Sequence, residues 1–377
     1  MSKRFIVTIA TLLIIAAAAG IAIFLAKGYS FSAKEKRIVG TGIINAASEP
    51  DAASVFVDGH LTTSTNATIS SLAPKNYSIK VVKEGFIPWE KDVKVSEGLV
   101  TELKITLFPA IPTVYPLTFS GVVAPILSPD GSKLAYVVPQ GKKGGVWVWT
   151  MARNQPLSFA RFSEPHQIAT NTLADFSKST LRWSPDSKQV LATVDSNNYL
   201  LNSDSLNSEP KDITAILEAT LKSWEDDTKA KEVSRIETIK NNKLRKIASD
   251  SALLRWSPDE TKFMSVESVE KVENLKKDQK DESKLSFKVY DSEDRKDYSL
   301  PAARFHAWLP DSKHIILVEE KTISIVDFDG LNKAVIYAGN FIDDFVFPWP
   351  DSSRLVIISS FPTPTASEPN LYGINLK

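Results

Sequence analysis

The chain of 377 residues contains no cysteine. This absence excludes disulfide bonds, thiolate metal sites and a cysteine nucleophile together. Histidine is scarce, and two of the four histidines, His306 and His314, flank a single turn. A metal pair at that turn is the one metal arrangement open to the sequence, and we predict no metal site and no cofactor. The other two histidines are His60 and His166.

The chain has no net formal charge, because 45 Lys and Arg residues balance 45 Asp and Glu residues. It has no basic stripe with interleaved aromatic residues, which excludes a nucleic-acid partner. It also lacks a Gly-x-Ser-x-Gly elbow, a His-Glu-x-x-His pair, a phosphate loop and a Gly-x-Gly-x-x-Gly turn. We therefore predict no catalytic residues and no enzymatic activity.

One long apolar run is present, from Phe5 to Ala26, after the basic pair Lys3 and Arg4. As a helix this run would measure about 33 Å, enough to cross a bilayer. We predict an uncleaved single-pass anchor that contacts lipid through residues 5–26, with residues 1–4 cytoplasmic and 27–37 a linker. The alternative is a signal peptide cleaved near Ala16 to Ala19. The flanking charges do not decide the orientation.

Residues 38–109 form a separate all-β module. Apolar and polar residues alternate along its runs, as they do in half-buried antiparallel strands. Turn signals such as Asp58-Gly59 and Glu84-Gly85 separate them. The predicted strands are Arg37–Gly40, Ser54–Val57, Tyr77–Val82, Trp89–Val95 and Leu99–Leu107.

This module resembles the PEGA domain, a small surface-layer-type β-sandwich. The resemblance rests on Pro50-Asp51-Ala52-Ala53, on Val55-Phe-Val-Asp-Gly59 and on Lys83-Glu-Gly-Phe86 with Trp89. Ala52 stands where the family has Gly, and Lys75-Asn76 stands where it has Pro-Gly. Phe86 and Trp89 present two alternatives, a platform for sugar rings or part of the core, and we expect the core.

The rest of the chain, residues 110–377, is built on a repeated Pro-Asp corner. Ser-Pro-Asp-Gly is typical of a type I β-turn, because Pro sets φ at the first central position and Asp is accepted at the second. The repeated aspartates, one in each corner, are predicted to bond the local backbone rather than form a ring of ligands. The corners are Leu127–Lys133, Arg182–Lys188, Arg255–Lys262, Trp308–Lys313 and Trp349–Arg354.

Each corner is followed by an apolar strand, a loop and a second strand. A unit of roughly 40 to 70 residues made only of strands indicates a β-propeller, in which one sheet makes each blade. A β-sandwich with Pro-Asp turns is the alternative. The predicted first strands are 134–138, 190–194, 263–266, 315–318 and 355–358, and the second strands are 146–151, 199–201, 287–290, 322–328 and 371–374.

The corners resemble the WD40-like repeats (PD40 repeats) of bacterial TolB-type propellers, whose blades carry a Trp-Ser-Pro-Asp-Gly turn. The resemblance implies five blades, or six if residues 212–250 hide a degenerate one, with a strand in 114–119 closing the ring. The residue two places before the corner Pro is expected to pack between blades. These residues are Leu127, Trp183, Trp256 and Trp308, and in the fifth unit Trp349 is displaced by one place.

Three stretches depart from this pattern. Apolar residues at helical spacing, from Ile213 to Trp224 and from Ile236 to Ile247, predict a helical insertion over residues 212–250, with Asp212 as the N-cap. The insertion is either a helical pair packed on the propeller, which we favour, or a blade partly replaced by helix. The charged stretch 267–284 and the Pro-rich stretch 361–369 are predicted loops.

These features predict a non-catalytic, membrane-anchored extracytoplasmic binding or scaffold protein of the bacterial cell envelope. The propeller would bind a protein or a cell-wall glycan. The alternative is a cell-wall or surface-layer attachment protein that binds glycan, and a remote one is a propeller component of a peptidase system. The chain ends at Lys377 directly after a blade strand, which leaves no room for a hydrolase domain. Neither the ligand nor the oligomeric state is predicted.

Overall fold

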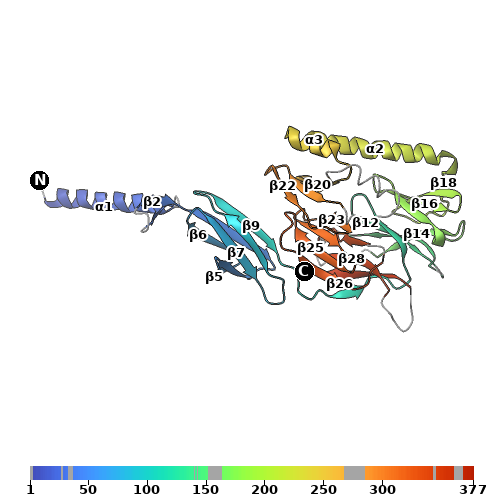
Figure 1. Ribbon diagram of the computed structural model, residues 1–377, viewed down its shortest axis with the longest axis horizontal. Helices are drawn as coiled ribbons and strands as arrows, with labels where there is room; N and C mark the ends of the chain where they lie inside the picture. The colour runs from blue at the N-terminus through green and yellow to red at the C-terminus, as the bar shows by residue number, and fades with distance from the viewer. Residues whose placement is uncertain are drawn as a thin grey trace. The chain divides into compact units, whose positions relative to one another are not determined.

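The computed structural model describes residues 3–26, 29–32, 37–139, 141, 143–151, 164–266, 285–342, 345–360 and 368–377. The predicted loop 267–284, and 361–367 of the predicted loop 361–369, lie outside the described residues. The chain divides into two compact units, residues 1–111 with Lys377 and residues 112–376 (Figure 1).

The chain begins with helix α1 (Lys3–Ala26), followed by an antiparallel pair of short strands, β1 (Tyr29–Ser32) and β2 (Arg37–Gly40). Within the described residues, no helix is both long enough and apolar enough to cross a membrane. The anchor over residues 5–26 stays a prediction.

The first unit contains two facing sheets. One has the order β6-β3-β9, with β3 and β9 parallel, and the other is antiparallel with the order β5-β4-β7-β8. The strands are β3 (Gly42–Glu49), β4 (Ser54–Val57), β5 (His60–Ser64), β6 (Ala67–Leu72), β7 (Asn76–Val82), β8 (Trp89–Lys94) and β9 (Val100–Thr106).

Alternation along the strands builds the core of this unit, because successive side chains of a strand point to opposite faces. Val55 and Val57 are buried on β4, and Ile79 and Val81 on β7. Trp89 is 8% exposed and belongs to the same core. Phe86 packs against that core. Both aromatic residues therefore have the expected core role, and Trp89 offers no open face to a sugar ring.

The turn at Ala52 has the conformation that the glycine of the family motif favours. The φ angle of Ala52 is 53°, in the left-handed region. The turn persists with alanine because the amide of Ala52 donates to the carbonyl of Thr65 at 2.9 Å. Lys75 and Asn76 have no positive φ, so the turn at that point does not require glycine.

The second unit contains five four-stranded antiparallel sheets within its described residues. Sheets 1 to 4 each follow the chain order, β11-β12-β13-β14, β15-β16-β17-β18, β19-β20-β21-β22 and β23-β24-β25-β26. Sheet 5 has the order β10-β29-β28-β27, so the first strand of the unit pairs with the last. The strand predicted within 114–119 is confirmed as β10, and Tyr115 on β10 lies opposite Gly373 on β29.

The bounds of sheets 1 and 2 are β11 (Val123–Leu127), β12 (Lys133–Val138), β13 (Gly145–Thr150), β14 (His166–Thr170), β15 (Thr180–Trp183), β16 (Gln189–Val194), β17 (Asn197–Asn202) and β18 (Lys211–Asp212). Those of sheets 3 and 4 are β19 (Leu254–Trp256), β20 (Lys262–Val266), β21 (Phe287–Asp291), β22 (Lys296–Ser299), β23 (Phe305–Trp308), β24 (His314–Val318), β25 (Thr322–Asp327) and β26 (Ala334–Ala338). Those of sheet 5 are β10 (Val114–Pro116), β27 (Val346–Pro348), β28 (Arg354–Ser359) and β29 (Asn370–Asn375).

Neighbouring sheets share apolar clusters. Trp183 of sheet 2 packs with Val146 of sheet 1, and Trp308 of sheet 4 packs with Phe287 of sheet 3. Phe347 of sheet 5 packs with Leu134 of sheet 1. The strands next to the corners are apolar throughout, so each sheet has two apolar faces. Neighbouring sheets on both sides cover these faces.

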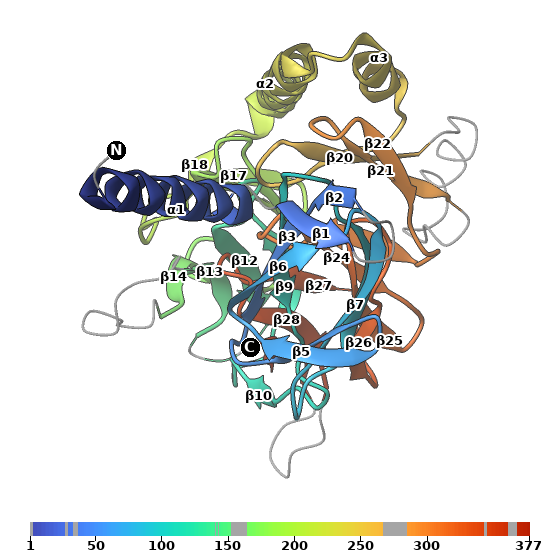
Figure 2. The same cartoon turned by 90° about the vertical axis from the view of Figure 1, so that its left-hand side faces the viewer.

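Along the chain, two helices follow sheet 2 and precede sheet 3: α2 (Leu217–Thr238) and α3 (Asn242–Asp250). No strand of the described residues falls within 217–250. Figures 1 and 2 show α2 beside β18 and α3 beside β20 and β22. A short 3₁₀ turn, η2 (Thr214–Ile216), precedes α2, and a second, η1 (Phe176–Lys178), precedes β15. Asp212 accepts from the amide of Thr214 at 2.8 Å. The N-cap residue of the 3₁₀ turn is Ile213 and that of α2 is Ile216, so the sequence prediction of Asp212 as the helix N-cap is wrong.

Candidate functional site

All five corners make the same four-residue turn. The amide of the fourth residue donates to the carbonyl of the first, as from Gly131 to Ser128 at 2.8 Å. The fourth residue has a left-handed φ, which explains the glycine in the first corner. These φ values are 69° for Gly131, 61° for Ser187, 59° for Glu260, 59° for Ser312 and 58° for Ser352.

The corner aspartates have the local role that the sequence predicted. Each carboxylate accepts from the main-chain amide two residues later, as Asp186 does from Lys188 at 3.1 Å. The hydroxyl of Ser184 also donates to Asp186 at 2.6 Å and lowers the pKa of that carboxyl. The same amide bond forms at Asp130, Asp259, Asp311 and Asp351.

The fourth corner replaces the serine with Leu309, and a histidine takes over its contact. His314 Nδ1 lies 2.6 Å from a carboxylate oxygen of Asp311, and its Nε2 lies 3.4 Å from Asp327. His306 Nε2 lies 2.9 Å from the carbonyl of Pro301 instead. The two histidines are thus held by different partners, and the described residues contain no group of three or more potential metal ligands.

Tryptophans next to the corners connect neighbouring sheets in two places. The indole N–H of Trp183 donates to the carbonyl of Ile126 in sheet 1, and that of Trp308 to the carbonyl of Arg255 in sheet 3, both at 3.0 Å. The displaced Trp349 of sheet 5 also reaches its neighbour, with its ring edge-on to Trp149 of sheet 1 at 5.4 Å.

Trp256 departs from this pattern and corrects the sequence prediction that it packs between sheets. Its ring is half-buried and lies 5.5 Å from the ring of Phe263 in its own sheet. Ile236 and Ile247 of the helical pair belong to the same apolar cluster. The helices occupy the place where sheet 2 would otherwise cover this tryptophan.

A cavity of about 560 Å³ lies where the corners and the first strands of the sheets converge. Sheets 1, 3, 4 and 5 contribute to its wall, and Arg235 contributes from α2. Among the described residues that line it, none comes from sheet 2. The aromatic residues of the wall are Trp256, Phe305, Trp308, Phe345 and Phe347, and the prolines are Pro129, Pro258, Pro310, Pro348 and Pro350.

The polar groups of this cavity are engaged with the protein itself. The hydroxyls of Ser128 and Ser257 donate to their corner aspartates at 2.6 Å. Arg235 Nε and Glu260 form an ion pair of 2.8 Å, with 46% of each side chain exposed. The wall thus favours the burial of an apolar or aromatic group, with one ion pair on its side.

The sequence did not identify the cavity, because its residues come from the corners, from the strands before them and from α2, which lie far apart in the chain. The signal present was the tryptophan two places before the corner Pro, at Trp256 and Trp308. No feature of the sequence pointed to Arg235, which reaches the cavity only because α2 crosses from sheet 2 to sheet 3.

Residues 41–111 match the PEGA domain family. No curated protein matches the chain. Among solved structures, a protein described as TolB from Agrobacterium tumefaciens is similar, with 15% identity, a TM-score of 0.24, and coverage of 70% of this chain and 89% of that one. TolB from Acinetobacter baumannii has 13% identity, a TM-score of 0.24 and coverage of 81% and 62%. A eukaryotic initiation factor has 14% identity, a TM-score of 0.22 and coverage of 81% and 72%.

Proposed function

We propose that the protein is an extracytoplasmic binding protein whose second unit is a five-bladed β-propeller that holds a protein partner in the corner cavity. The four sheets that follow the chain order support the propeller, as does the fifth sheet, in which the pairing of β10 with β29 joins the beginning of the unit to its end. Propellers commonly close in this way, because a strand from one end of the unit completes the blade formed by the other end.

We also propose that residues 5–26 anchor the protein in the cell membrane, with both units outside the cytoplasm. The support is the uncharged sequence of these residues and the exposure of apolar side chains on α1. Leu12, Leu13, Ile14 and Ile15 are each 61% exposed or more. The free energy falls when a lipid phase covers such a row of apolar side chains.

The observation that carries the proposed binding function is the aromatic wall of the cavity. Phe305 and Trp256 are half-buried, so part of each ring faces open space inside the unit. Aromatic and apolar side chains of a protein partner would bury this surface. A glycan would need several free polar groups for its hydroxyls, and Ser128 and Ser257 already donate to aspartates.

The test blocks the cavity with a long charged side chain. Ala307 lines the cavity on β23, and Ala307→Arg would fill it. Val335→Arg is the matched control, because Val335 lies on the outer strand of the same sheet and is 47% exposed. The full chain is purified from its host after chemical cross-linking, and co-purified proteins are quantified by mass spectrometry.

We expect at least one protein that co-purifies with the wild type and with Val335→Arg and is lost with Ala307→Arg. If the same proteins co-purify in equal amounts with both variants, the cavity is not the binding site. Binding of purified cell-wall glycan by all three chains, with no cavity-dependent protein, would favour the attachment function instead.

A further inference from the structure

The joints between sheets 1 and 2 and between sheets 3 and 4 share a pair of hydrogen bonds. In each, the indole N–H of the corner tryptophan donates to a carbonyl of the preceding sheet, from Trp183 to Ile126 and from Trp308 to Arg255. In each, a corner amide donates to the corner serine of the next sheet. These amide bonds run from Asp130 to Ser187 at 3.2 Å and from Asp259 to Ser312 at 3.0 Å.

The joint between sheets 2 and 3 has neither bond. By position, Trp256 should donate to the carbonyl of Arg182, but its Nε1 is buried and has no hydrogen-bond partner among the described residues. The serine position is occupied by Glu260, whose carboxylate pairs with Arg235 of α2 at 2.8 Å. A buried donor without a partner costs free energy, so this joint is the weaker one.

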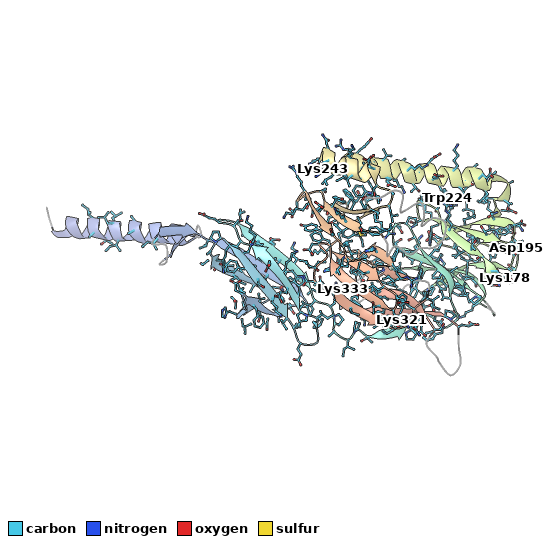
Figure 3. All side chains as sticks on the ribbon, viewed as in Figure 1. Lys178, Asp195, Trp224, Lys243, Lys321 and Lys333 are labelled. Carbon is cyan, nitrogen blue, oxygen red and sulfur yellow. The ribbon has the colours of Figure 1, made fainter. Side chains whose placement is uncertain are left out.

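Helix α2 takes the place of the missing bonds. Its first part is fixed on sheet 2, where Trp224 packs against Leu191 (Figure 3). Its last turn continues to Ile239, which packs against Phe263 of sheet 3. Residues 225–235 between these two anchors are all exposed, which is about three turns of helix.

Two polar contacts link this exposed segment to the corners below it. Lys231 Nζ donates to the carbonyl of Pro185 in the corner of sheet 2 at 3.1 Å, and Arg235 pairs with Glu260 in the corner of sheet 3. Exposed polar contacts contribute little to stability. The Lys231 hydrogen bond and the Arg235–Glu260 ion pair therefore exchange readily with water.

The same ion pair lies between two cavities. Arg235 and Glu260 line the aromatic cavity, and Glu260 also lines a polar cavity of about 700 Å³ under the link between α2 and α3. Loss of the pair would connect the two spaces on the side where sheet 2 supplies no wall.

We propose that α2 and α3 form a strap that holds sheets 2 and 3 together in place of a direct joint, and that the Arg235–Glu260 pair is the gate of the aromatic cavity. Local opening at this joint lets a side chain enter, whereas the joints made by Trp183 and Trp308 stay closed. The proposal goes beyond partner binding and depends only on the geometry of the second unit.

The test compares two double variants of α2 in the full chain. Lys231→Ala with Arg235→Ala removes the contacts to the corners. Glu225→Ala with Lys229→Ala is the control, because it removes an ion pair of 2.7 Å within the same helix, although Glu225 also interacts electrostatically with Arg182. Hydrogen exchange is followed by mass spectrometry at the corners of sheets 1 to 4.

We expect exchange at the corners of sheets 2 and 3 to rise about threefold to tenfold in the strap variant and to stay unchanged in the control. Exchange at the corners of sheets 1 and 4 serves as the internal reference. An equal rise at all four corners would mean general destabilisation and would overturn the strap. No rise at any corner would overturn it as well.

Access to the cavity is measured by thiol labelling, which reports only on the introduced cysteine because the chain has no other. Ala307→Cys reports on the cavity, and Val335→Cys reports on the exposed outer strand. A maleimide reagent should label Ala307→Cys about threefold to tenfold faster with the strap variant than with the helix control, and label Val335→Cys at one rate in both. Equal rates for Ala307→Cys in both backgrounds would overturn the gate.

Discussion

The indole N–H of Trp308 donates a hydrogen bond of 3.0 Å to the main-chain carbonyl of Arg255, a residue of the neighbouring sheet. The guanidinium of Arg255 returns the contact, donating to the carbonyl of His306 at 2.6 Å and covering the ring of Phe305 at 5.0 Å. Sheets 3 and 4 are therefore joined by directional bonds as well as by apolar packing.

Replacing each corner tryptophan in turn with phenylalanine distinguishes the two hydrogen-bonded joints from the joint that lacks this bond. Trp183→Phe and Trp308→Phe should each lower the free energy of unfolding by about 0.5 to 1.5 kcal/mol, because each leaves a part-buried carbonyl, of Ile126 or of Arg255, without its indole donor. Trp256→Phe should change it by less than about 0.5 kcal/mol, since its N–H has no partner to lose. Urea unfolding followed by circular dichroism gives all three values. A loss at Trp256 as large as at Trp308 would contradict the weak joint.

The closing strand depends on the absence of a side chain at Gly373. A Cβ at this position would lie 2.7 Å from the ring of Tyr115 on β10, so Gly373→Ala must displace that ring. We expect a loss of about 1 to 3 kcal/mol in the free energy of unfolding. Tyr115→Ala should remove the clash, so the double variant should be more stable than the sum of the single effects predicts. Strict additivity would mean that β10 does not close the unit.

The fourth corner should lose stability in acid. Burial raises the pKa of Asp311, but the contact with His314 and the bonds from the amides of Lys313 and His314 outweigh it and hold the pKa below its usual value. The unfolded chain therefore binds more protons, and this contribution is complete above about pH 4 and lost as the pH falls through the folded pKa.

Asp311→Asn removes that dependence. We expect a loss of about 1 to 3 kcal/mol at pH 7 and a smaller difference from the wild type at pH 3. Asp226→Asn, at an exposed position of α2, should leave the pH profile of the wild type unchanged. Urea midpoints at pH 7, 5, 4 and 3 measure these profiles, and a constant difference between Asp311→Asn and the wild type would refute the assignment.

The proposed anchor predicts where the two units lie. Protease added to intact spheroplasts should remove the bulk of the protein, leaving a fragment that contains residues 5–26. The same protease should not touch a cytoplasmic marker protein until the cells are lysed. Full protection of the chain in intact spheroplasts would overturn the proposed orientation.

Local signals predicted the corners and the two central strands of each sheet. Pro and Asp specify the turn through their own backbone preferences, and runs such as Ile315 to Val318 are apolar in sequence as they are buried in the structure. Among the first and last strands of the sheets, only β10 was expected, within the predicted stretch 114–119, and the others were missed. They are short, as at Leu254–Trp256 and Lys211–Asp212, and pairing with longer neighbours forms them.

The cavity could not be predicted, since it depends on how residues far apart in the sequence are placed next to one another. The apolar spacing of Ile213, Leu221 and Trp224 indicated a helix, but not that α2 would cross to the next sheet and bring Arg235 against Glu260. The partnerless N–H of Trp256 is likewise invisible in the sequence, where its motif is a close copy of the motif around Trp183.

The most direct test of partner binding places a photo-reactive benzoyl-phenylalanine at Phe305, inside the cavity, or at Val335, on the outer strand of the same sheet. Irradiation of intact cells should give a protein adduct from position 305 that is absent from position 335 and that disappears when Ala307→Arg is added. Adducts from position 305 that persist with Ala307→Arg, or adducts from position 335 alone, would contradict binding in the corner cavity.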